Sequence, residues 1–485
     1  MIRSGATSTD KKVREPAREI NVCREADVVV VGGGPAGVAA AIAAARNGAK
    51  TVLVERYGHL GGMATGGLVI LIPHLSDGLK EQQIGGICQE IVSRLDAVGA
   101  AIHPRYEDLG SNDRKLVKFW QDYLFFVIEG RIRLSVLVDP EILKCVLNDL
   151  TEEAGVTLFL HSWSTRALVE KKSVRGVIFE SKSGRQAILS KVVIDATGDG
   201  DIFASAGAPF DGKLDPKLRI ATLALIFQMG NVDTWKFSRF MAKEQQRYGE
   251  LMYELEGLGG FSLVLRSQRE DVVWVNNYFP KWVPNYMKSF VTETAGEASE
   301  KGGLSALSFE DLTWVEVNAR KGMLITYNFF KKNVPGFEKS FIMNVAPQVG
   351  TRGSRRLIGE YIVTEKDIRT GTVHDDTIAV CPSIDGNVSP EHPHMCIPYR
   401  SLLPRKVENL LVAGRCFSSD VVANDVLNII PFCVAMGQAA GAAAGMAAKA
   451  DVSPGDIDIR SLQRHLIDQN VVLPPAIEAH AKTRA

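Results

Sequence analysis

Three glycines near the start of the sequence carry its clearest chemical signal. They are Gly32, Gly34 and Gly37 in the stretch "VVVVGGGPAG", and their spacing is G-x-G-x-x-G. Gly32 permits a tight turn, Gly34 lets a pyrophosphate approach the backbone, and Gly37 lets the next helix pack closely against the preceding strand. These residue types at this spacing predict a loop that binds the phosphates of a dinucleotide.

The flanking residues predict the elements that must position this loop. The valine-rich run 27–31 predicts a buried strand, and Pro35 suits the first turn of a helix that continues over 36–48. The free N–H groups of that helix then face the phosphates. A second strand, over 50–55, ends in Glu55, whose carboxylate can accept hydrogen bonds from both ribose hydroxyls and would repel the 2′-phosphate of NADP.

The segments that follow favour FAD over NAD. An NAD-binding domain would continue with alternating strands and helices, whereas residues 56–67 read "RYGHLGGMATGG", a glycine-rich backbone suited to lie against a flat or extended ligand. Two later strands end at 196–199 and at 414–415. A helix expected over 429–450 has glycines four residues apart, which allow a very close approach to a neighbouring helix, and its N-terminus offers further N–H donors.

On these motifs the chain resembles the FAD-dependent oxidoreductases of the glutathione-reductase-like fold. More narrowly, it resembles a group that begins "REPAR…DVVVVGGGPAG…ERYG.LGGMAT" and ends "NLLVAGR…GQAAG.AA". The matching positions cover most of the chain; they are 14–18, 27–37, 55–65, 193–201, 335–360 and 397–445. The resemblance implies the fold and the cofactor, and it leaves the substrate open because the group is chemically diverse.

The resemblance also implies which residues hold FAD, from the pyrophosphate and ribose to the ribityl chain, the flavin and the adenine. These expected cofactor-binding residues are Gly32, Gly34, Pro35, Ala36, Gly37, Glu55, Arg56, Gly62, Met63, Thr65, Ala167, Gly198, Gly414, Arg415 and Gln438. The helix that begins near Pro431 is expected to point at the flavin pyrimidine ring, where its dipole would stabilise negative charge.

The expected fold class is α/β, with a Rossmann-like FAD-binding domain interrupted by a mixed α+β substrate domain. The FAD-binding domain is predicted to be discontinuous, over 26–75, 135–205 and 345–450. Residues 76–134 are expected to form a helical insertion, 206–344 the substrate domain, and 451–485 a C-terminal tail.

Three polar residues are candidates for the chemistry. His394 is a plausible base for oxidising a C–O or C–N bond, although a plain loop histidine is an equally good interpretation. Arg352 begins an arginine cluster that could bind a carboxylate, with structural ion pairs as the alternative. Asn428 stands where the resembled group typically has Arg, which favours a substrate with a neutral hydroxyl or amine at this spot. His392, His394 and Cys396 resemble metal ligands, but no further cluster completes a site, so no metal is expected.

Composition narrows the class of protein. The 485 residues carry 56 basic and 56 acidic side chains, which argues against a nucleic-acid partner. The seven cysteines are scattered without a C-x-x-C pair, the first 22 residues lack an apolar run, and the uncharged stretch 432–448 is rich in Ala and Gly. We therefore expect a cytoplasmic protein with a small-molecule substrate and no membrane partner, and homo-oligomerisation stays open.

The predicted function is that of an enzyme, an FAD-dependent dehydrogenase or oxidase that transfers a hydride between a small organic substrate and the flavin N5. A non-catalytic binding protein on the same fold is one alternative, but the intact glycine loop and Glu55 favour catalysis. A flavin-dependent monooxygenase is the other alternative, and the missing D-G-x-x-S-x-x-R pattern disfavours an aromatic hydroxylase.

Overall fold

The chain divides into two compact units. The computed structural model describes residues 12–78, 82–215, 217–276, 304–383 and 394–482. The larger unit consists of Cys23–Lys213, Leu265–Glu270 and Arg355–Ala485, and the smaller unit of Met1–Val22, Leu214–Val264 and Asp271–Ser354.

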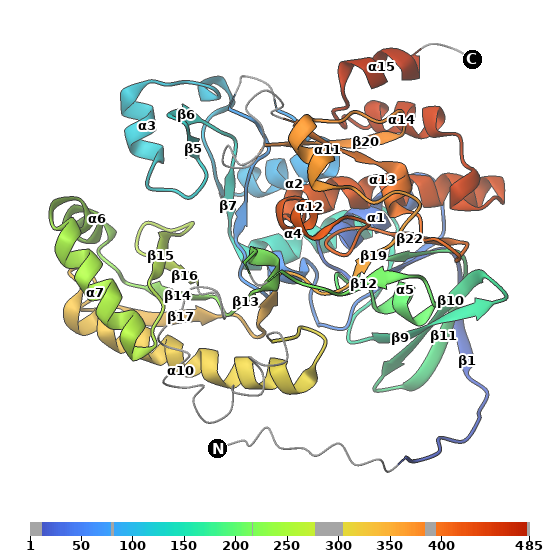
Figure 1. The fold of residues 1–485 in the computed structure, drawn as a ribbon, viewed down its shortest axis with the longest axis horizontal. Coiled ribbons are helices and arrows are strands. Elements are labelled where there is room, and N and C mark those ends of the chain that lie inside the picture. The colour runs from blue at the N-terminus through green and yellow to red at the C-terminus, as the bar shows by residue number, and fades with distance from the viewer. Residues whose placement is uncertain (1–11, 79–81, 216, 277–303, 384–393, 483–485) are drawn as a thin grey trace. The chain divides into compact units, whose positions relative to one another are not determined.

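A parallel sheet organises the larger unit (Figure 1). Its strands lie in the order β8 (Thr157–Phe159), β2 (Thr51–Val54), β1 (Asn21–Val31) and β11 (Gly184–Asp195), and β22 (Leu410–Val412) pairs with the end of β11. The pairs β1–β2, β2–β8 and β11–β22 are all parallel, so these strands end at the same edge. The four valines that end β1 are almost completely buried, as expected for a strand covered on both faces. The predicted α/β class with a Rossmann-like parallel sheet is confirmed.

An antiparallel extension continues this sheet beyond β11. Strands β9 (Trp163–Glu170) and β10 (Ser173–Ser181) form a meander with the first half of β11. The short helix α5 (Asp201–Ser205) packs against β9. Ala167, one of the expected cofactor-binding residues, lies in β9 of this extension.

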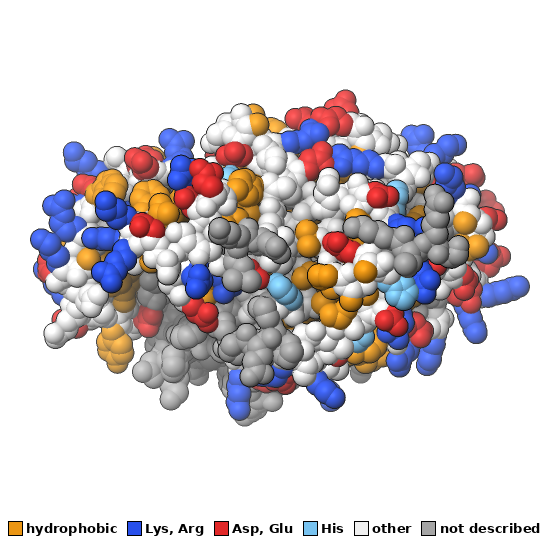
Figure 2. Space-filling model, turned by 90° about the horizontal axis from the view of Figure 1, so that it is seen from above, with side chains coloured by type: hydrophobic (Ala, Val, Ile, Leu, Met, Phe, Trp, Pro, Cys, Tyr) orange, Lys and Arg blue, Asp and Glu red, His pale blue; other side chains and the backbone are white. Residues whose placement is uncertain are grey.

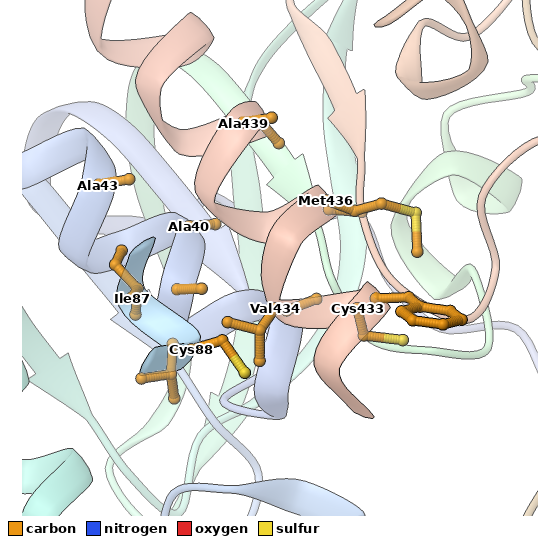
Figure 3. Packing of buried hydrophobic residues seen from close by; sticks show 14 of the residues in the cluster. Ala40, Ala43, Ile87, Cys88, Cys433, Val434, Met436 and Ala439 are labelled. Carbon is orange, nitrogen blue, oxygen red and sulfur yellow. The ribbon is translucent and has the colours of Figure 1, made fainter. Parts of the chain in front are cut away.

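Two helices of small residues lie along each other on one face of the sheet. They are α1 (Pro35–Arg46) and α13 (Ile430–Ala450), which Figure 3 shows at close range. A Cβ added at Gly437 would lie 2.1 Å from the carbonyl oxygen of Ala36, and one added at Gly441 would lie 2.1 Å from that of Ala40. Both contacts advance by four residues in the same direction, so the helices run parallel and begin at the same end. The close approach predicted from the glycine spacing is confirmed.

Helix α13 is the one helix of the described residues whose length and composition would suit a membrane span. Its most apolar window is, however, 83% buried inside the protein. Its hydrophobic core also contains alanines of α1 and apolar side chains of α2 (Gly86–Ala97), α4 (Pro140–Glu153), β20 (Thr377–Pro382) and β21 (His394–Pro398). Figure 3 shows Ile87 and Cys88 of α2 beside Val434 of α13.

The predicted insertion and the predicted tail both belong to the larger unit. Residues 76–134 contain short strands as well as helices. The described part of residues 451–485 contains the helices α14 (Ile459–Asp468) and α15 (Pro475–Lys482), and α14 packs on α13 and β20. These segments are not accessories, because their apolar side chains complete the core around α13. The remaining elements of this unit are η1 (Gly62–Ala64), β3 (Leu71–Ile72), β4 (Ala101–Ile102), η2 (Tyr106–Asp108), α3 (Arg114–Trp120), β5 (Val127–Ile128), β6 (Arg131–Ile132), β7 (Val136–Val138), β12 (Phe210–Asp211), β19 (Arg356–Leu357), α11 (Glu365–Thr370), β20 (Thr377–Pro382), β21 (His394–Pro398), η4 (Tyr399–Leu402), α12 (Val421–Leu427), η5 (Pro454–Asp456), α14 (Ile459–Asp468) and α15 (Pro475–Lys482).

The smaller unit is built on an antiparallel sheet with the strand order β15 (Leu263–Arg266), β16 (Val273–Asn276), β14 (Phe227–Gly230) and β17 (Phe341–Val345). Trp274 of β16 is buried in its core. The other elements are η3 (Arg219–Ala221), β13 (Leu223–Ala224), α6 (Thr234–Lys243), α7 (Gln245–Leu258), α10 (Phe309–Asn333) and β18 (Gly350–Thr351). On the face drawn in Figure 2, basic and acidic side chains of the described residues are interspersed, as the zero net charge would suggest.

Candidate active site

In the glycine loop between β1 and α1, the fold itself requires glycine at two positions and leaves space for a side chain at a third. Gly32 has a φ of +100°, and a Cβ there would lie 2.5 Å from the carbonyl oxygen of Ala196. A Cβ at Gly37 would lie 1.7 Å from the carbonyl oxygen of Gly32. A Cβ at Gly34 would meet no atom within 4 Å. The protein's own backbone therefore accounts for the first and third glycines, whereas the open space at Gly34 fits a ligand that approaches the backbone.

Glu55 locks this loop to the end of β2. Its side chain is buried, and its carboxylate accepts hydrogen bonds from the N–H of Gly33 (2.6 Å) and the N–H of Tyr57 (2.8 Å). Each carboxylate oxygen keeps further lone pairs that can accept a ribose hydroxyl. The adjacent Arg56 places its guanidinium over the rings of Tyr57 (4.8 Å) and Trp163 (5.4 Å).

The segment after Glu55 folds back onto the glycine loop. Gly61 has a φ of +96° and donates its N–H to the carbonyl oxygen of Gly33 (2.8 Å). Gly62 has a φ of +49°, and its Cβ would lie 2.9 Å from the Cα of Gly34. The buried hydroxyl of Thr65 donates to the carbonyl oxygen of Leu60 (2.6 Å), so it stabilises this turn. Met63 lies half-buried in the short helix η1, which begins at Gly62.

Two loops from β11 and β22 bring a second set of expected residues to the same edge of the sheet. Gly198 and Gly414 have φ values of +77° and +91°. Arg415 donates from Nη2 to Oδ1 of Asp199 (2.7 Å), and both side chains are largely buried. Among the described residues, the buried Nη1 of Arg415 has no hydrogen-bond partner. A buried cationic donor without a partner is costly, and a cofactor phosphate or hydroxyl would satisfy it.

The buried side chain of Asp195 holds the backbone in place at this edge of the sheet. Its carboxylate accepts hydrogen bonds from the N–H and hydroxyl of Thr197 and from the N–H groups of Ile202 and Phe203. These bonds hold the 196–200 turn and the first turn of α5. Burial raises the pKa of Asp195 to about 6, although the hydrogen bonds from Phe203 and Thr197 oppose the shift.

The parallel packing of α1 and α13 brings two helix N-termini together. Neither N-cap residue, Gly34 for α1 or Ile429 for α13, supplies a side-chain cap among the described residues. Each helix therefore presents unsatisfied N–H groups and the positive end of its dipole at the same end of the pair. Gly414 lies beside this end, because its Cβ would be 2.8 Å from the Cβ of Ala36. The arrangement suits the negative charges of FAD.

Two of the expected cofactor-binding residues have hydrogen-bond partners within the protein. The N–H of Ala167 donates to the hydroxyl of Ser205 (2.9 Å), so this group is not available to an adenine. The amide of Gln438 accepts from the N–H of Ile87 (2.9 Å) and donates to the side chain of Gln469 (3.1 Å). Gln438 lies in the third turn of α13 and joins α2 and α14 to that helix, which is a structural role.

His394, the candidate base, has a partner that the sequence did not indicate. Its Nε2 lies 2.9 Å from Oδ2 of Asp77, whose carboxylate is buried. His394 begins β21, and the neighbouring His392 lies outside the described residues. The described residues contain no group of three or more His, Cys, Asp or Glu side chains that could hold a metal ion.

Asp77 lies in the segment expected to be a mere insertion, and no local motif marks it. Asp77 and His394 are 317 positions apart in the sequence, so their contact can be recognised only in the folded structure.

The other candidates have different surroundings. Arg352 belongs to the smaller unit, where its backbone N–H donates to the carbonyl oxygen of Thr222. Its two arginine neighbours belong to the larger unit and form ion pairs there, Arg355 with Asp201 and Arg356 with Asp211. The ion-pair alternative thus holds for Arg355 and Arg356, and a carboxylate-binding role for Arg352 stays a prediction. Asn428 is the C-cap residue of α12, and Ile429 separates it from the start of α13.

Part of this chain is similar in sequence to known proteins. Two curated relatives from Methanopyrus kandleri are digeranylgeranylglycerophospholipid reductases 1 and 2. Reductase 1 is 29% identical over 177 residues, which are 36% of this chain and 40% of the relative. Reductase 2 is 27% identical over 174 residues, which are 36% of this chain and 38% of the relative. The match thus spans less than half of either relative.

Solved structures resemble the fold more weakly. A geranylgeranyl bacteriochlorophyll reductase-like protein from Thermoplasma acidophilum is 14% identical with a TM-score of 0.44, and the match covers 95% of this chain and 88% of that one. The p-nitrophenol 4-monooxygenase PnpA from Pseudomonas putida is 12% identical with a TM-score of 0.43, covering 94% and 92%.

The comparison with family models is decisive for the class of protein. The model described as FAD dependent oxidoreductase matches residues 27–466. The geometry agrees with that cofactor at the glycine loop, at Glu55 and at the uncapped N-termini of α1 and α13. The chain belongs to the FAD dependent oxidoreductase family, and it is an enzyme that uses FAD.

Proposed function

We propose that this enzyme is a dehydrogenase or oxidase that transfers a hydride between a small organic substrate and FAD, with His394 moving the substrate proton. The observation that carries the proposal is the position of His394 relative to α13. His394 pairs with Pro382 across the β20–β21 hairpin. The thiol of Cys381 in this hairpin has a pKa raised well above its usual value, chiefly by burial and further by the nearby thiols of Cys396 and Cys433.

Strand β20 packs against α13, and Cys433 lies in the first turn of that helix, so the hairpin that carries His394 lies against α13. The N-terminus of α13 is also proposed to support FAD binding. A titratable imidazole beside a flavin site supports proton transfer to or from a hydroxyl or amine. The side chain of His394 is 39% exposed, so a substrate can reach it.

Each group has a separate task in the proposed reaction. FAD, when bound, supplies the acceptor or donor of the hydride. The loop residues Gly34 and Glu55 and the N-termini of α1 and α13 hold and orient the cofactor. His394 accepts the proton of a substrate hydroxyl or amine during oxidation and returns it in the reverse direction. Asn428, next to the start of α13, is proposed to hydrogen-bond a neutral polar group of the substrate.

An anaerobic assay tests this function. The purified holoenzyme is mixed with a panel of alcohols and amines, and bleaching of the flavin absorbance reports its reduction. The curated relatives are named reductases, so the chemically reduced enzyme is also mixed with the corresponding carbonyl and unsaturated compounds. His394→Ala should slow substrate-driven reduction about 10²-fold while the flavin content stays normal.

Two results would contradict the proposal. An unchanged reduction rate in His394→Ala would remove His394 from the reaction. Flavin reduction by NADH or NADPH alone, followed by incorporation of an oxygen atom from O₂ into the organic product, would identify a monooxygenase instead. Asn428→Arg provides a further test, because the cation should block the substrate while FAD stays bound.

A further inference from the structure

The contact between Asp77 and His394 joins a buried group to an accessible one. The carboxylate of Asp77 is 1% exposed, and the imidazole of His394 is 39% exposed. A carboxylate that is buried needs hydrogen-bond donors, and the Nε2 of His394, 2.9 Å away, is in position to be one. The imidazole is thereby fixed on one edge while part of its surface stays open.

The loop around Asp77 is held by its own contacts, independently of the histidine. The N–H of Asp77 donates to Oε1 of Gln83 (2.8 Å). The N–H of Leu75 donates to the carbonyl oxygen of Leu134 (2.8 Å), and the N–H of Leu134 donates to the hydroxyl of Ser76 (2.8 Å). Asp77 is thus part of an ordered turn along the 132–135 segment.

A second contact ties the same region to the hairpin of His394. The buried Arg133 donates from Nη1 to the carbonyl oxygen of Ser383 (2.8 Å), the residue directly after β20. Gly78 fits against this arginine, because a Cβ there would lie 3.2 Å from its Nε. Two independent hydrogen bonds therefore fix the distance between the Asp77 turn and the end of the β20–β21 hairpin.

We propose that Asp77 is a positioning residue that holds the proton of His394 on Nε2 and leaves Nδ1 as the atom that accepts the substrate proton. A carboxylate can only accept a hydrogen bond, so a neutral imidazole beside it must donate from Nε2 and keep its lone pair on Nδ1. The charge of Asp77 also stabilises the imidazolium that forms when the proton arrives.

This inference rests on the proposed function, and its proton balance follows from it. During oxidation of an alcohol, the substrate C–H and O–H bonds break and a C=O bond forms. The hydride leaves to the cofactor and the O–H proton goes to Nδ1 of His394. An amine reacts in the same way, with an N–H proton and a C=N product.

A double-mutant cycle tests the positioning role. Asp77→Asn should lower the rate of substrate-driven flavin reduction about 10²-fold, because the Asn amide can donate a hydrogen bond to the ring and favour the wrong tautomer. In the His394→Ala background the same substitution should have no further effect. Equal losses in both backgrounds would show that Asp77 acts only on the fold, and an unchanged rate in Asp77→Asn would show that it does not act on the reaction.

The chain offers a matched control for this substitution. Asp96 on α2 also lies near a histidine, with its Oδ1 3.5 Å from Nε2 of His103, but its side chain is 58% exposed. Asp96→Asn should reduce its flavin at the wild-type rate. A loss equal to that of Asp77→Asn would attribute the effect to the loss of any histidine–carboxylate contact, and the proposal would fall.

A second measurement needs no turnover. ¹⁵N NMR of histidine-labelled protein, with His394 assigned by its loss in His394→Gln, reads which ring nitrogen carries the proton. Wild type should show a protonated Nε2, and Asp77→Asn a mixture of tautomers. A proton on Nδ1 of wild type would overturn the proposal even if Asp77→Asn did not fold. If no substrate reduces the wild-type flavin, the proposed function fails, while the NMR result still decides the tautomer.

Discussion

The glycine loop allows cofactor binding to be perturbed without disturbing the fold. Gly34 has a φ of −72° and open space where a Cβ would stand, so the protein without FAD can accept a side chain there. Gly37 cannot, because its Cβ would lie 1.7 Å from a backbone oxygen. Gly34→Asp should therefore abolish FAD binding in a folded protein, whereas Gly37→Ala should damage the fold itself.

The magnitudes follow from this geometry. In the absence of FAD, Gly34→Asp and Gly34→Ala should unfold within about 1 kcal/mol of wild type, since both replace a glycine in an allowed conformation. Wild type gains about 2.7 kcal/mol when free FAD is a hundred times its Kd, and Gly34→Asp should gain none, because a carboxylate stands on the pyrophosphate path. Gly37→Ala should cost about 3 kcal/mol or more with or without FAD, because the α1 backbone has to move.

Thermal unfolding with and without added FAD, together with the flavin absorbance of the purified protein, measures both effects. Gly34→Ala separates the steric part from the charge, because it adds a methyl group alone and should weaken FAD binding less than Gly34→Asp. Purification of Gly34→Asp with a full complement of flavin would refute the assignment of the phosphate path. A Gly34→Asp protein that melts far below wild type without FAD would refute the claim that the space is open.

Two further predictions concern the elements behind the site. Gly441→Ala should lower the free energy of unfolding by about 1–2 kcal/mol, because overpacking against the Ala40 carbonyl oxygen at 2.1 Å outweighs the gain in helix propensity. Gly445→Ala should cost less, since its nearest contact, at 2.7 Å, is the Asn47 side chain; urea unfolding of both variants decides, and a more stable Gly441→Ala would contradict the close approach. The advantage of wild type over Asp195→Asn should be largest below pH 3.8, the ordinary pKa, and should fall as the pH rises through about 6, because burial raises the pKa in the folded state. Urea midpoints of both proteins over this range measure it, and an advantage that grows with pH would mean that the four donors outweigh burial.

The parts of the site that the sequence predicted are those with a local signal. The turn at Gly32, the packing requirement at Gly37 and the stripe of glycines along α13 each follow from the lack of a side chain at a fixed spacing. Such patterns are readable because the cause and the effect lie within one strand–turn–helix unit or one helix face. The structure adds what the stripe achieves, since the parallel approach of α13 to α1 brings their N-termini together.

The partners of polar side chains were not predictable in the same way. Gln438 lies in the "GQAAG" stretch, but its amide joins α2 and α14 to α13, which no sequence pattern predicts. Arg355 and Arg356 belong to the arginine cluster after Arg352, and they pair with Asp201 and Asp211, which precede them by more than a hundred residues. The charge of an arginine predicts that it needs an acidic partner, but it does not predict where in the sequence that partner lies.

The unpredicted partners of polar side chains matter most for function in the segment 76–134, which contains Asp77. The sequence predicted a helical insertion here, and a carboxylate in such a segment is usually solvated. Asp77 is instead buried, in a turn that is held along 132–135 and that contacts His394, the first residue of β21. The proposed acid–base pair therefore depends on a segment outside the predicted FAD-binding domain. A truncation or replacement of this segment should accordingly impair the reaction as well as the core, and Asp77→Asn distinguishes the two because it leaves the core side chains in place.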